Sequence, residues 1–119
     1  MSKKKDPLAA VKARRAEGAS IWVPEGWTDL MLELHAALVA VSPDFAYAQI
    51  KQKFGELRVY VSGATAEARD LITAAEVASR TICEVCGTPG SPCVSSHGWY
   101  RALCAVHAAE NGYQVADGG

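Results

Sequence analysis

Two pairs of candidate metal ligands stand close together in the last third of the chain. Cys83 and Cys86 form a Cys-x-x-Cys pair, and Cys104 and His107 form a Cys-x-x-His pair, with seventeen residues between the pairs. A tetrahedral zinc ion takes four nitrogen or sulfur ligands, usually as two such pairs. The spacing therefore predicts a Zn²⁺ site made of these four side chains. Buried or redox-active thiols are the alternative interpretation.

The residues around the pairs predict how they are held. Gly87 follows the second cysteine and can adopt a positive φ, so the first pair suits a tight knuckle. Cys104 and His107 are three residues apart and share one face of a helix. The order knuckle, hairpin, helix is typical of a treble-clef zinc finger. Four protein ligands leave no coordination position for water, so we expect a structural site that stabilises a small segment.

The neighbouring residues do not favour a catalytic zinc. Nucleobase deaminases combine Pro-Cys-x-x-Cys with His-x-Glu, whereas Ile82 precedes Cys83 here and two alanines follow His35. Cys93 and His97 have no partner at pair spacing. We expect Cys93 to be a free thiol, packed or exposed, and His97 to be a turn residue. His35 should lie at the surface or at the boundary of the core.

The composition is that of an ordinary globular domain. The chain has 119 residues, 50% hydrophobic and 21% charged, with a net charge of −1. One domain with a modest core is expected, and a nucleic-acid polycation is excluded. No apolar run approaches the roughly 20 residues of a membrane span, and the chain starts without the apolar region of a signal peptide. We therefore expect a cytoplasmic protein whose reduced cysteines can bind metal.

Charge and hydrophobicity divide the chain into three segments. Residues 1–20 contain half of the twelve basic residues and few apolar ones. We expect this segment to be a basic flexible arm, which either aids solubility or binds nucleic acid or a partner. Residues 21–112 should form one domain that includes the zinc unit at residues 81–112. Residues 113–119 should be a short tail.

Apolar residues at a period of 3.6 predict the helices of this domain. The first helix should span residues 28–41, with Thr28 as its N-cap. The second should span residues 66–80, with Thr65 as its N-cap. A last helix should begin near Cys104 and end at Gly112.

Between the first two helices, residues 45–63 alternate with a period of two and predict a β-hairpin. We place its turn at Gly55-Glu56, as a type II′ turn. One face should join the core; it contains Ile50, Phe54, Leu57, Val59 and Val61. The opposite face carries Lys51, Lys53, Arg58 and Tyr60. The predicted fold is therefore α+β: helix, β-hairpin, helix, and a treble-clef-like zinc unit.

The basic face of the hairpin is the candidate partner-binding surface. Like charges opposite each other on a sheet are unfavourable, so a Lys53–Arg58 pair suggests attraction of carboxylates or phosphates. Arg and Tyr side chains also often dominate the binding energy of an interface. Plain solvation of a half-exposed hairpin is the alternative interpretation.

Three stretches resemble small phage- and prophage-encoded zinc-binding proteins of unknown function. They are Gln49-Ile-Lys-Gln-Lys-Phe-Gly-Glu-Leu-Arg, Thr81-Ile-Cys-Glu-Val-Cys-Gly-Thr-Pro-Gly and Leu103-Cys-Ala-Val-His. The resemblance covers about residues 22–110, and Glu56 stands where the pattern has a second glycine. It implies a phage setting, the host cytoplasm and a zinc-binding α+β unit, and it implies no reaction.

Three classes of function follow. The favoured one is a non-enzymatic phage-type effector that binds a host protein or ribonucleoprotein, for example an inhibitor of a bacterial defence complex such as an anti-CRISPR. The second is a nucleic-acid-binding zinc-finger accessory protein that uses the basic face and the arm. An enzyme such as a treble-clef nuclease would need a further His and Asn at a second metal, and only His97 and Asn111 are available. No membrane partner is expected.

Overall fold

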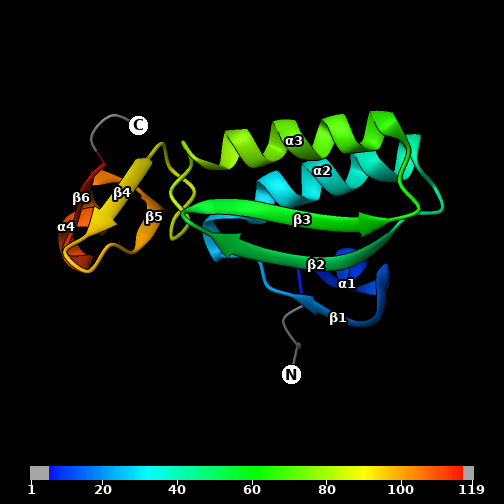
Figure 1. Ribbon diagram of the computed structural model, residues 1–119, viewed down its shortest axis with the longest axis horizontal. Helices are drawn as coiled ribbons and strands as arrows, with labels where there is room; N and C mark the ends of the chain where they lie inside the picture. Colours follow the sequence, from blue (N-terminus) through cyan, green and yellow to red (C-terminus); the bar gives the residue numbers. More distant parts are fainter. Residues whose placement is uncertain (1–5, 117–119) are drawn as a thin grey trace, which may run out of the picture.

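The computed structural model describes residues 6–116 and shows an α+β fold with two small sheets (Figure 1). In chain order the elements are α1 (Ala9–Ala13), β1 (Arg15–Ile21), the 3-10 helix η1 (Glu25–Trp27), α2 (Thr28–Val41), β2 (Ala46–Lys53), β3 (Glu56–Ser62), α3 (Ala66–Ser79), β4 (Ser91–Ser95), β5 (Tyr100–Leu103), α4 (Ala105–Asn111) and β6 (Tyr113–Val115). The sheets have the orders β1-β2-β3 and β5-β4-β6. The α+β prediction is confirmed. No helix in this part of the chain is long and apolar enough to cross a bilayer.

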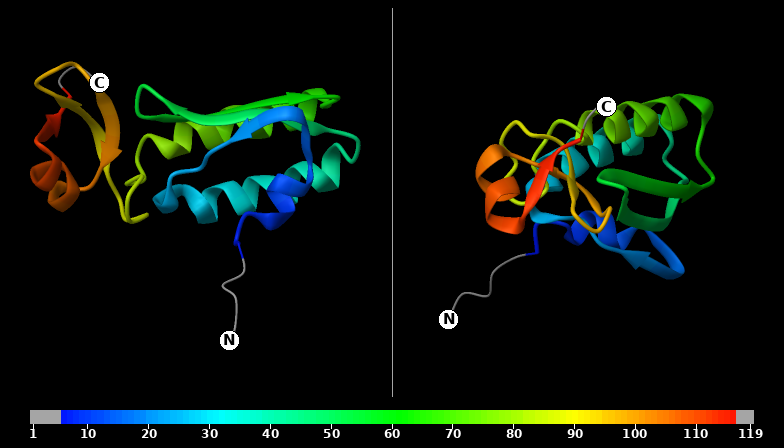
Figure 2. Two further views of the ribbon diagram at one scale, coloured as in Figure 1. Left: turned by 90° about the horizontal axis from the view of Figure 1, so that it is seen from below. Right: turned by 60° about the vertical axis from the view of Figure 1, so that its left-hand side comes forward.

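The first sheet and helices α1 to α3 form the larger lobe. The helices lie on one side of the strands in the left view of Figure 2. Side chains from both layers form the main core, whose largest fully buried members are Trp27, Met31, Leu38, Tyr47, Ile50 and Leu57. The indole N–H of Trp27 donates to the carbonyl oxygen of Ile82 at 2.9 Å. This bond ties the core of the larger lobe to the chain just before the predicted zinc ligands.

The two long helices lie where the hydrophobic period predicts them. Helix α2 spans the predicted residues, but Thr28 is not its N-cap. A 3-10 turn precedes the helix, and the Thr28 hydroxyl donates to the carbonyl of Glu25 at 2.8 Å. Helix α3 begins after Thr65, whose hydroxyl accepts the Ala68 N–H at 3.1 Å, as predicted.

Helix α3 also covers the free edge of β3. The Ser79 hydroxyl accepts the Leu57 N–H at 2.9 Å, and the Glu76 carboxylate accepts the Val59 N–H at 3.0 Å. Unpaired edge N–H groups invite pairing with another chain. Side chains of α3 satisfy these two donors within the fold.

The structure differs from the expectation of a flexible arm over residues 1–20. Residues 9–13 form α1, and residues 15–21 form β1, which pairs in parallel with β2. Leu8 and Val11 are buried in the main core. The Arg14 guanidinium donates to the carbonyls of Pro43 and Phe45 at 2.7 and 3.0 Å. Two apolar anchors and these contacts order the segment, while residues 1–5 of the expected arm lie outside the described residues.

The predicted hairpin is present, but its turn lies one residue earlier than expected. The central turn residues are Phe54 and Gly55, with φ of 54° and 78°, the pattern of a type I′ turn. The predicted Gly55-Glu56 turn is therefore wrong, and Lys51, not Lys53, pairs with Arg58. Residues of both strands nevertheless point to the predicted sides of the sheet, because moving the turn by one residue shifts every cross-strand partner by two. Phe54, expected in the core, is 73% exposed in the turn.

A β-bulge at Ala48 turns Tyr47 into the core. Tyr47 pairs with Val61 while Gln49 pairs with Tyr60, so β2 carries one extra residue here. Tyr47 is fully buried, and its hydroxyl lies 2.7 Å from Nδ1 of His35. His35 is half-buried, as predicted for a boundary residue.

The second sheet and α4 form a small lobe at one end of the molecule (Figure 1). Helix α4 ends at Gly112, which has a φ of 73°, as predicted. The expected tail is wrong for residues 113–115, because these residues form β6 and pair with β4. Residues 117–119 of that tail lie outside the described residues. The core of this lobe consists of Cys83, Cys93, Leu103 and Ala108.

Candidate metal centre

The four predicted ligands meet in the small lobe. The sulfur atoms of Cys83, Cys86 and Cys104 and a ring nitrogen of His107 all lie within 4.8 Å of one another. Nδ1 of His107 is 3.2 Å from the Cys104 sulfur and 3.6 Å from the Cys83 sulfur. The sulfurs of Cys86 and Cys104 are 3.9 Å apart. This Cys3His cluster could hold one metal ion.

Two local structures bring the ligands together. The turn after Cys83 is closed by a hydrogen bond from the Gly87 N–H to the Cys83 carbonyl at 2.8 Å, and Gly87 has a φ of 80°. Cys104 occupies the N-cap position of α4, and His107 lies in its first turn. A knuckle and a helix start therefore supply one ligand pair each, as the sequence predicts.

The thiols of the cluster have different acidities. A hydrogen bond with the Thr88 hydroxyl lowers the pKa of Cys86 to about 7, and the sulfur lies 3.0 Å from that oxygen. A backbone hydrogen bond from His107 lowers the pKa of Cys104. Burial raises the pKa of Cys83. Two of the three thiols are thus prepared to lose their protons, which metal binding requires.

Cys93 and His97 are not part of the cluster. Cys93 is 1% exposed, and its thiol lies near the carbonyls of Ser91 and Leu103. Burial raises the pKa of this thiol. His97 is exposed in the turn between β4 and β5. A packed free thiol and a turn histidine were both expected.

Glu84, inside the Cys83–Cys86 knuckle, is a residue that sequence reasoning missed. Its side chain is 4% exposed, and its carboxylate accepts the Ala102 N–H at 3.2 Å and the Gln52 side-chain N–H at 3.1 Å. It also lies 3.4 Å from Nε of Arg101. A charged residue between two ligand cysteines was the available signal. Glu84 connects the knuckle to both hairpins.

Backbone contacts strengthen this connection. The Gly26 N–H donates to the Glu84 carbonyl at 2.8 Å. A Cβ atom on Gly26 would lie 2.0 Å from the carbonyl oxygen of Cys83, so no other residue fits there. Gly55 is buried, and a Cβ atom on it would lie 3.2 Å from the backbone of Arg101. The knuckle thus packs on η1, and the hairpin tip packs on β5.

The residues predicted to bind a partner lie near one another but are not equally accessible. Lys51, Arg58 and Tyr60 share the sheet face opposite the core, and the Lys51 Nζ lies 5.9 Å from the centre of the Tyr60 ring. Arg58 is half-buried and lies 3.6 Å from a carboxylate oxygen of Glu56. Lys53 is exposed next to the turn. Lys51 and Arg58 are therefore only partly accessible, whereas Lys53 and Tyr60 are exposed.

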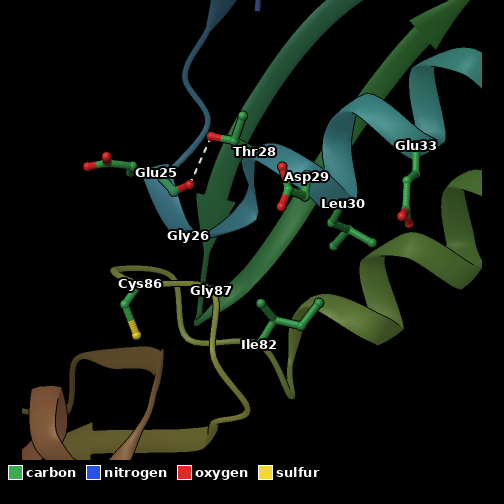
Figure 3. A pocket seen from close by; sticks show the side chains of 9 residues that line it. All are labelled: Glu25, Gly26, Thr28, Asp29, Leu30, Glu33, Ile82, Cys86 and Gly87. Carbon is green, nitrogen blue, oxygen red and sulfur yellow. Dashed lines mark hydrogen bonds between the residues drawn. The ribbon is translucent and has the colours of Figure 1, made fainter. Parts of the chain in front are cut away.

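A depression borders the cluster on the side of η1 and α2 (Figure 3). Cys86 and Gly87 line it together with three acidic side chains, Glu25, Asp29 and Glu33. These carboxylates come from η1 and the first turns of α2, on the helical side of the molecule. The surface charge is therefore uneven, acidic here and basic along β2.

Comparison with models of known protein families, with curated proteins and with solved structures finds no significant match for this chain. The resemblance to phage-encoded proteins stays a prediction from the sequence. The geometry of the site carries the functional argument.

Proposed function

We propose that the Cys3His cluster holds one Zn²⁺ ion in a treble-clef-like unit. In a tetrahedral zinc site, sulfurs about 2.3 Å from the metal lie about 3.8 Å apart, and a sulfur and an imidazole nitrogen lie about 3.5 Å apart. The Cys86–Cys104 separation of 3.9 Å and the His107 separations of 3.2 and 3.6 Å lie near these values, and all four ligand atoms lie within 4.8 Å of one another. Three thiolates and an imidazole bind zinc in preference to harder cations.

The role of this zinc is structural. Four protein ligands complete a tetrahedron, whereas a catalytic zinc keeps one position for water or substrate. The small lobe has only four buried apolar side chains in its own core cluster among residues 6–116. Such a core stabilises little, so a metal bound by the folded state adds free energy that this lobe needs.

The proposed function is a non-enzymatic, phage-type effector that binds a host protein or ribonucleoprotein. The observation that carries it is that the small lobe, which contains the four-ligand cluster, is fixed against the hairpin tip by Glu84 and by the contact of Gly55 with Arg101. A metal that stabilises one lobe and has no open coordination position suits a binding protein better than an enzyme. The phage setting comes from the sequence resemblance, and inhibition of a defence complex is one form of this activity.

The proposed contact surface is the basic sheet face formed by Lys51, Lys53, Arg58 and Tyr60. Lys51 and Tyr60 lie side by side there, and Lys53 projects near the turn. Arg58 is half-buried and lies 3.6 Å from a carboxylate oxygen of Glu56, so its side chain is partly restrained before a partner arrives. A restrained side chain loses less conformational entropy on binding than a free one.

Metal analysis tests the zinc. Purified protein should contain about one zinc per chain, and Cys104→Ser should lose it. Cys93→Ser is the matched control, because Cys93 is a buried thiol outside the cluster. A fully folded protein without bound metal would contradict the assignment, as would loss of zinc from the Cys93→Ser variant.

Affinity capture from host cells tests the effector role. The tagged protein should enrich one host complex, and Lys51→Glu/Lys53→Glu should reduce its recovery at least tenfold. Arg15→Glu is the control, because Arg15 is an exposed basic residue on β1. Capture that does not depend on the lysines would place the contact elsewhere, and the absence of any enriched complex would refute the proposal.

A further inference from the structure

Two hairpin tips meet and enclose a groove that shares only Lys53 with the proposed contact surface. One wall is the β2–β3 turn with Lys53 and Phe54, and the other is the β4–β5 turn with His97, Trp99 and Tyr100. The groove has a volume of about 340 Å³. It lies at the junction of the two lobes.

The groove exposes three aromatic rings. Phe54 is 73% exposed, Trp99 68% and Tyr100 44%. Single exposed apolar residues are common, but three large rings from two separate hairpins form a patch, and such patches mark binding sites. None of the three rings belongs to either hydrophobic core cluster. Packing of the hydrophobic cores therefore does not explain why these three rings lie here.

Phe54 is held in an unfavourable conformation as well as exposed. It is the sole non-glycine residue with a positive φ among residues 6–116. A bulky residue with positive φ is a genuine outlier, and a type I′ turn prefers Asn or Gly at this position. A residue that opposes the local turn and adds nothing to the core points to a role in binding.

Both walls of the groove are fixed. The Gln52 side chain donates to the carbonyl of Tyr100 and to Glu84, both at 3.1 Å. The Ser95 hydroxyl accepts the N–H groups of His97 and Trp99 at 3.2 and 3.1 Å. The rings are therefore presented on ordered turns, which lowers the entropy cost of binding a ligand between them.

Lys53 is the charged side chain in the lining of the groove. Of the other basic residues of the two hairpins, Arg58 lies beside the carboxylate of Glu56 and Arg101 lies beside that of Glu84. Glu56 is buried and bound to Arg58 and Arg80. The Lys53 Nζ lies 5.6 Å from the centre of the Phe54 ring, so a cation stands directly beside an exposed ring.

We propose that this groove binds single-stranded nucleic acid, with unpaired bases stacked on Phe54 and Trp99 and a phosphate near Lys53. Exposed rings combined with flanking cations are the pattern of single-strand binding. A duplex does not expose the faces of its bases, so the rings would have no use in duplex binding. The inference goes beyond the proposed effector role, because it concerns a groove that shares only Lys53 with the basic sheet face, and either can fail while the other holds.

The test is fluorescence anisotropy with the zinc-loaded protein and labelled twelve-nucleotide probes: oligouridylate, oligothymidylate and a duplex of mixed sequence. We expect a single strand to bind at least tenfold more tightly than the duplex. Trp99→Ala and Phe54→Asn should each weaken binding about fivefold or more, the lower end for loss of one stacked base. Trp22→Ala is the matched control, because Trp22 is also exposed, at 55%, and does not line the groove.

Salt dependence separates phosphate contacts from stacking. Lys53→Ala should reduce the slope of log Kd against log salt by about 0.7, the value for one phosphate contact on a single strand. Trp99→Ala should leave that slope unchanged. Equal affinity for duplex and single strand would overturn the proposal, as would full single-strand binding by Trp99→Ala. The proposal would also be overturned if the protein bound no oligonucleotide at low salt and the groove variants instead lost capture of a host protein. That outcome would leave the effector role intact.

Discussion

Replacing Glu84 by glutamine tests whether the knuckle is held to the hairpins by a buried carboxylate. Glu84 is 4% exposed and meets three donors, on Ala102, Gln52 and Arg101. Glutamine keeps the volume and one acceptor oxygen. It removes the charge and turns an amide N–H₂ group toward the guanidinium. The change therefore isolates the electrostatic part of the contact.

The expected cost follows from these contacts. A hydrogen bond to a charged acceptor contributes about 1 kcal/mol more than one to a neutral acceptor, which gives about 2 kcal/mol for the two bonds from Ala102 and Gln52. The pair with Arg101 adds less than about 1 kcal/mol, because the arginine side chain is 29% exposed and screened by water. Glu84→Gln should therefore lower the free energy of unfolding by about 2 to 3 kcal/mol. Glu84→Ala should cost about 3 to 5 kcal/mol, because it leaves buried donors unpaired.

Urea denaturation of the zinc-loaded protein measures this effect, with metal content determined for each variant. Glu110→Gln, an exposed neutralisation on α4, is the control and should stay within about 0.5 kcal/mol of the wild type. In a double-mutant cycle with Gln52→Ala, the coupling energy should exceed about 0.5 kcal/mol. A Glu84→Gln protein as stable as the control variant would refute the structural role given to this carboxylate.

Four further predictions test other parts of the structure. Removing zinc with a chelator should lower the melting temperature and abolish protection of the small lobe against proteolysis, while re-addition of zinc restores both. Burial, with a smaller contribution from Arg14, lowers the pKa of His35 below its ordinary 6.5. Below pH 6.5 the unfolded state binds a proton that the folded state does not, so the free energy of unfolding should fall as the pH drops from 6.5 toward the lowered pKa. Denaturation series at different pH should show this dependence, and His35→Gln should flatten it. Cys93→Ser should cost about 1 kcal/mol, because the hydroxyl can use the carbonyls near the thiol, and should retain the metal on elemental analysis. Phe54→Asn should raise the free energy of unfolding by about 0.5 to 1 kcal/mol, because asparagine tolerates positive φ; a loss of stability in urea titration would contradict the strained turn.

Local patterns allowed much of this structure to be predicted. The positions of α2, α3 and α4 follow from apolar residues that repeat within a few turns and from Thr65 and Gly112 at the helix ends. The metal ligands could be predicted equally well, because one pair lies within a single knuckle and the other within a single helix turn. These features depend on residues fewer than about five positions apart, where sequence spacing and spatial distance are closely related.

The features that sequence reasoning missed depend on distant contacts. The pairing of β1 with β2 joins residues about thirty positions apart, and Arg14 secures it by bonds to Pro43 and Phe45. The Phe54-Gly55 turn contradicts the local preference for glycine at the first position with positive φ, so the glycine was assigned to the wrong place. Glu84 is a charged residue in a short turn, and only the approach of Gln52 and Arg101 explains its burial.

The division of the molecule into two lobes gives the metal different effects on the two proposed surfaces. Lys51, Arg58 and Tyr60 belong to the larger lobe, whose core does not include the metal ligands. Trp99 and Tyr100 belong to the small lobe, whose core cluster contains Cys83. Loss of zinc should therefore remove one complete wall of the aromatic groove while leaving the basic sheet face folded. Binding through the groove requires the metal, whereas binding through the sheet face tolerates its removal, so a single chelation experiment identifies which surface a given partner uses.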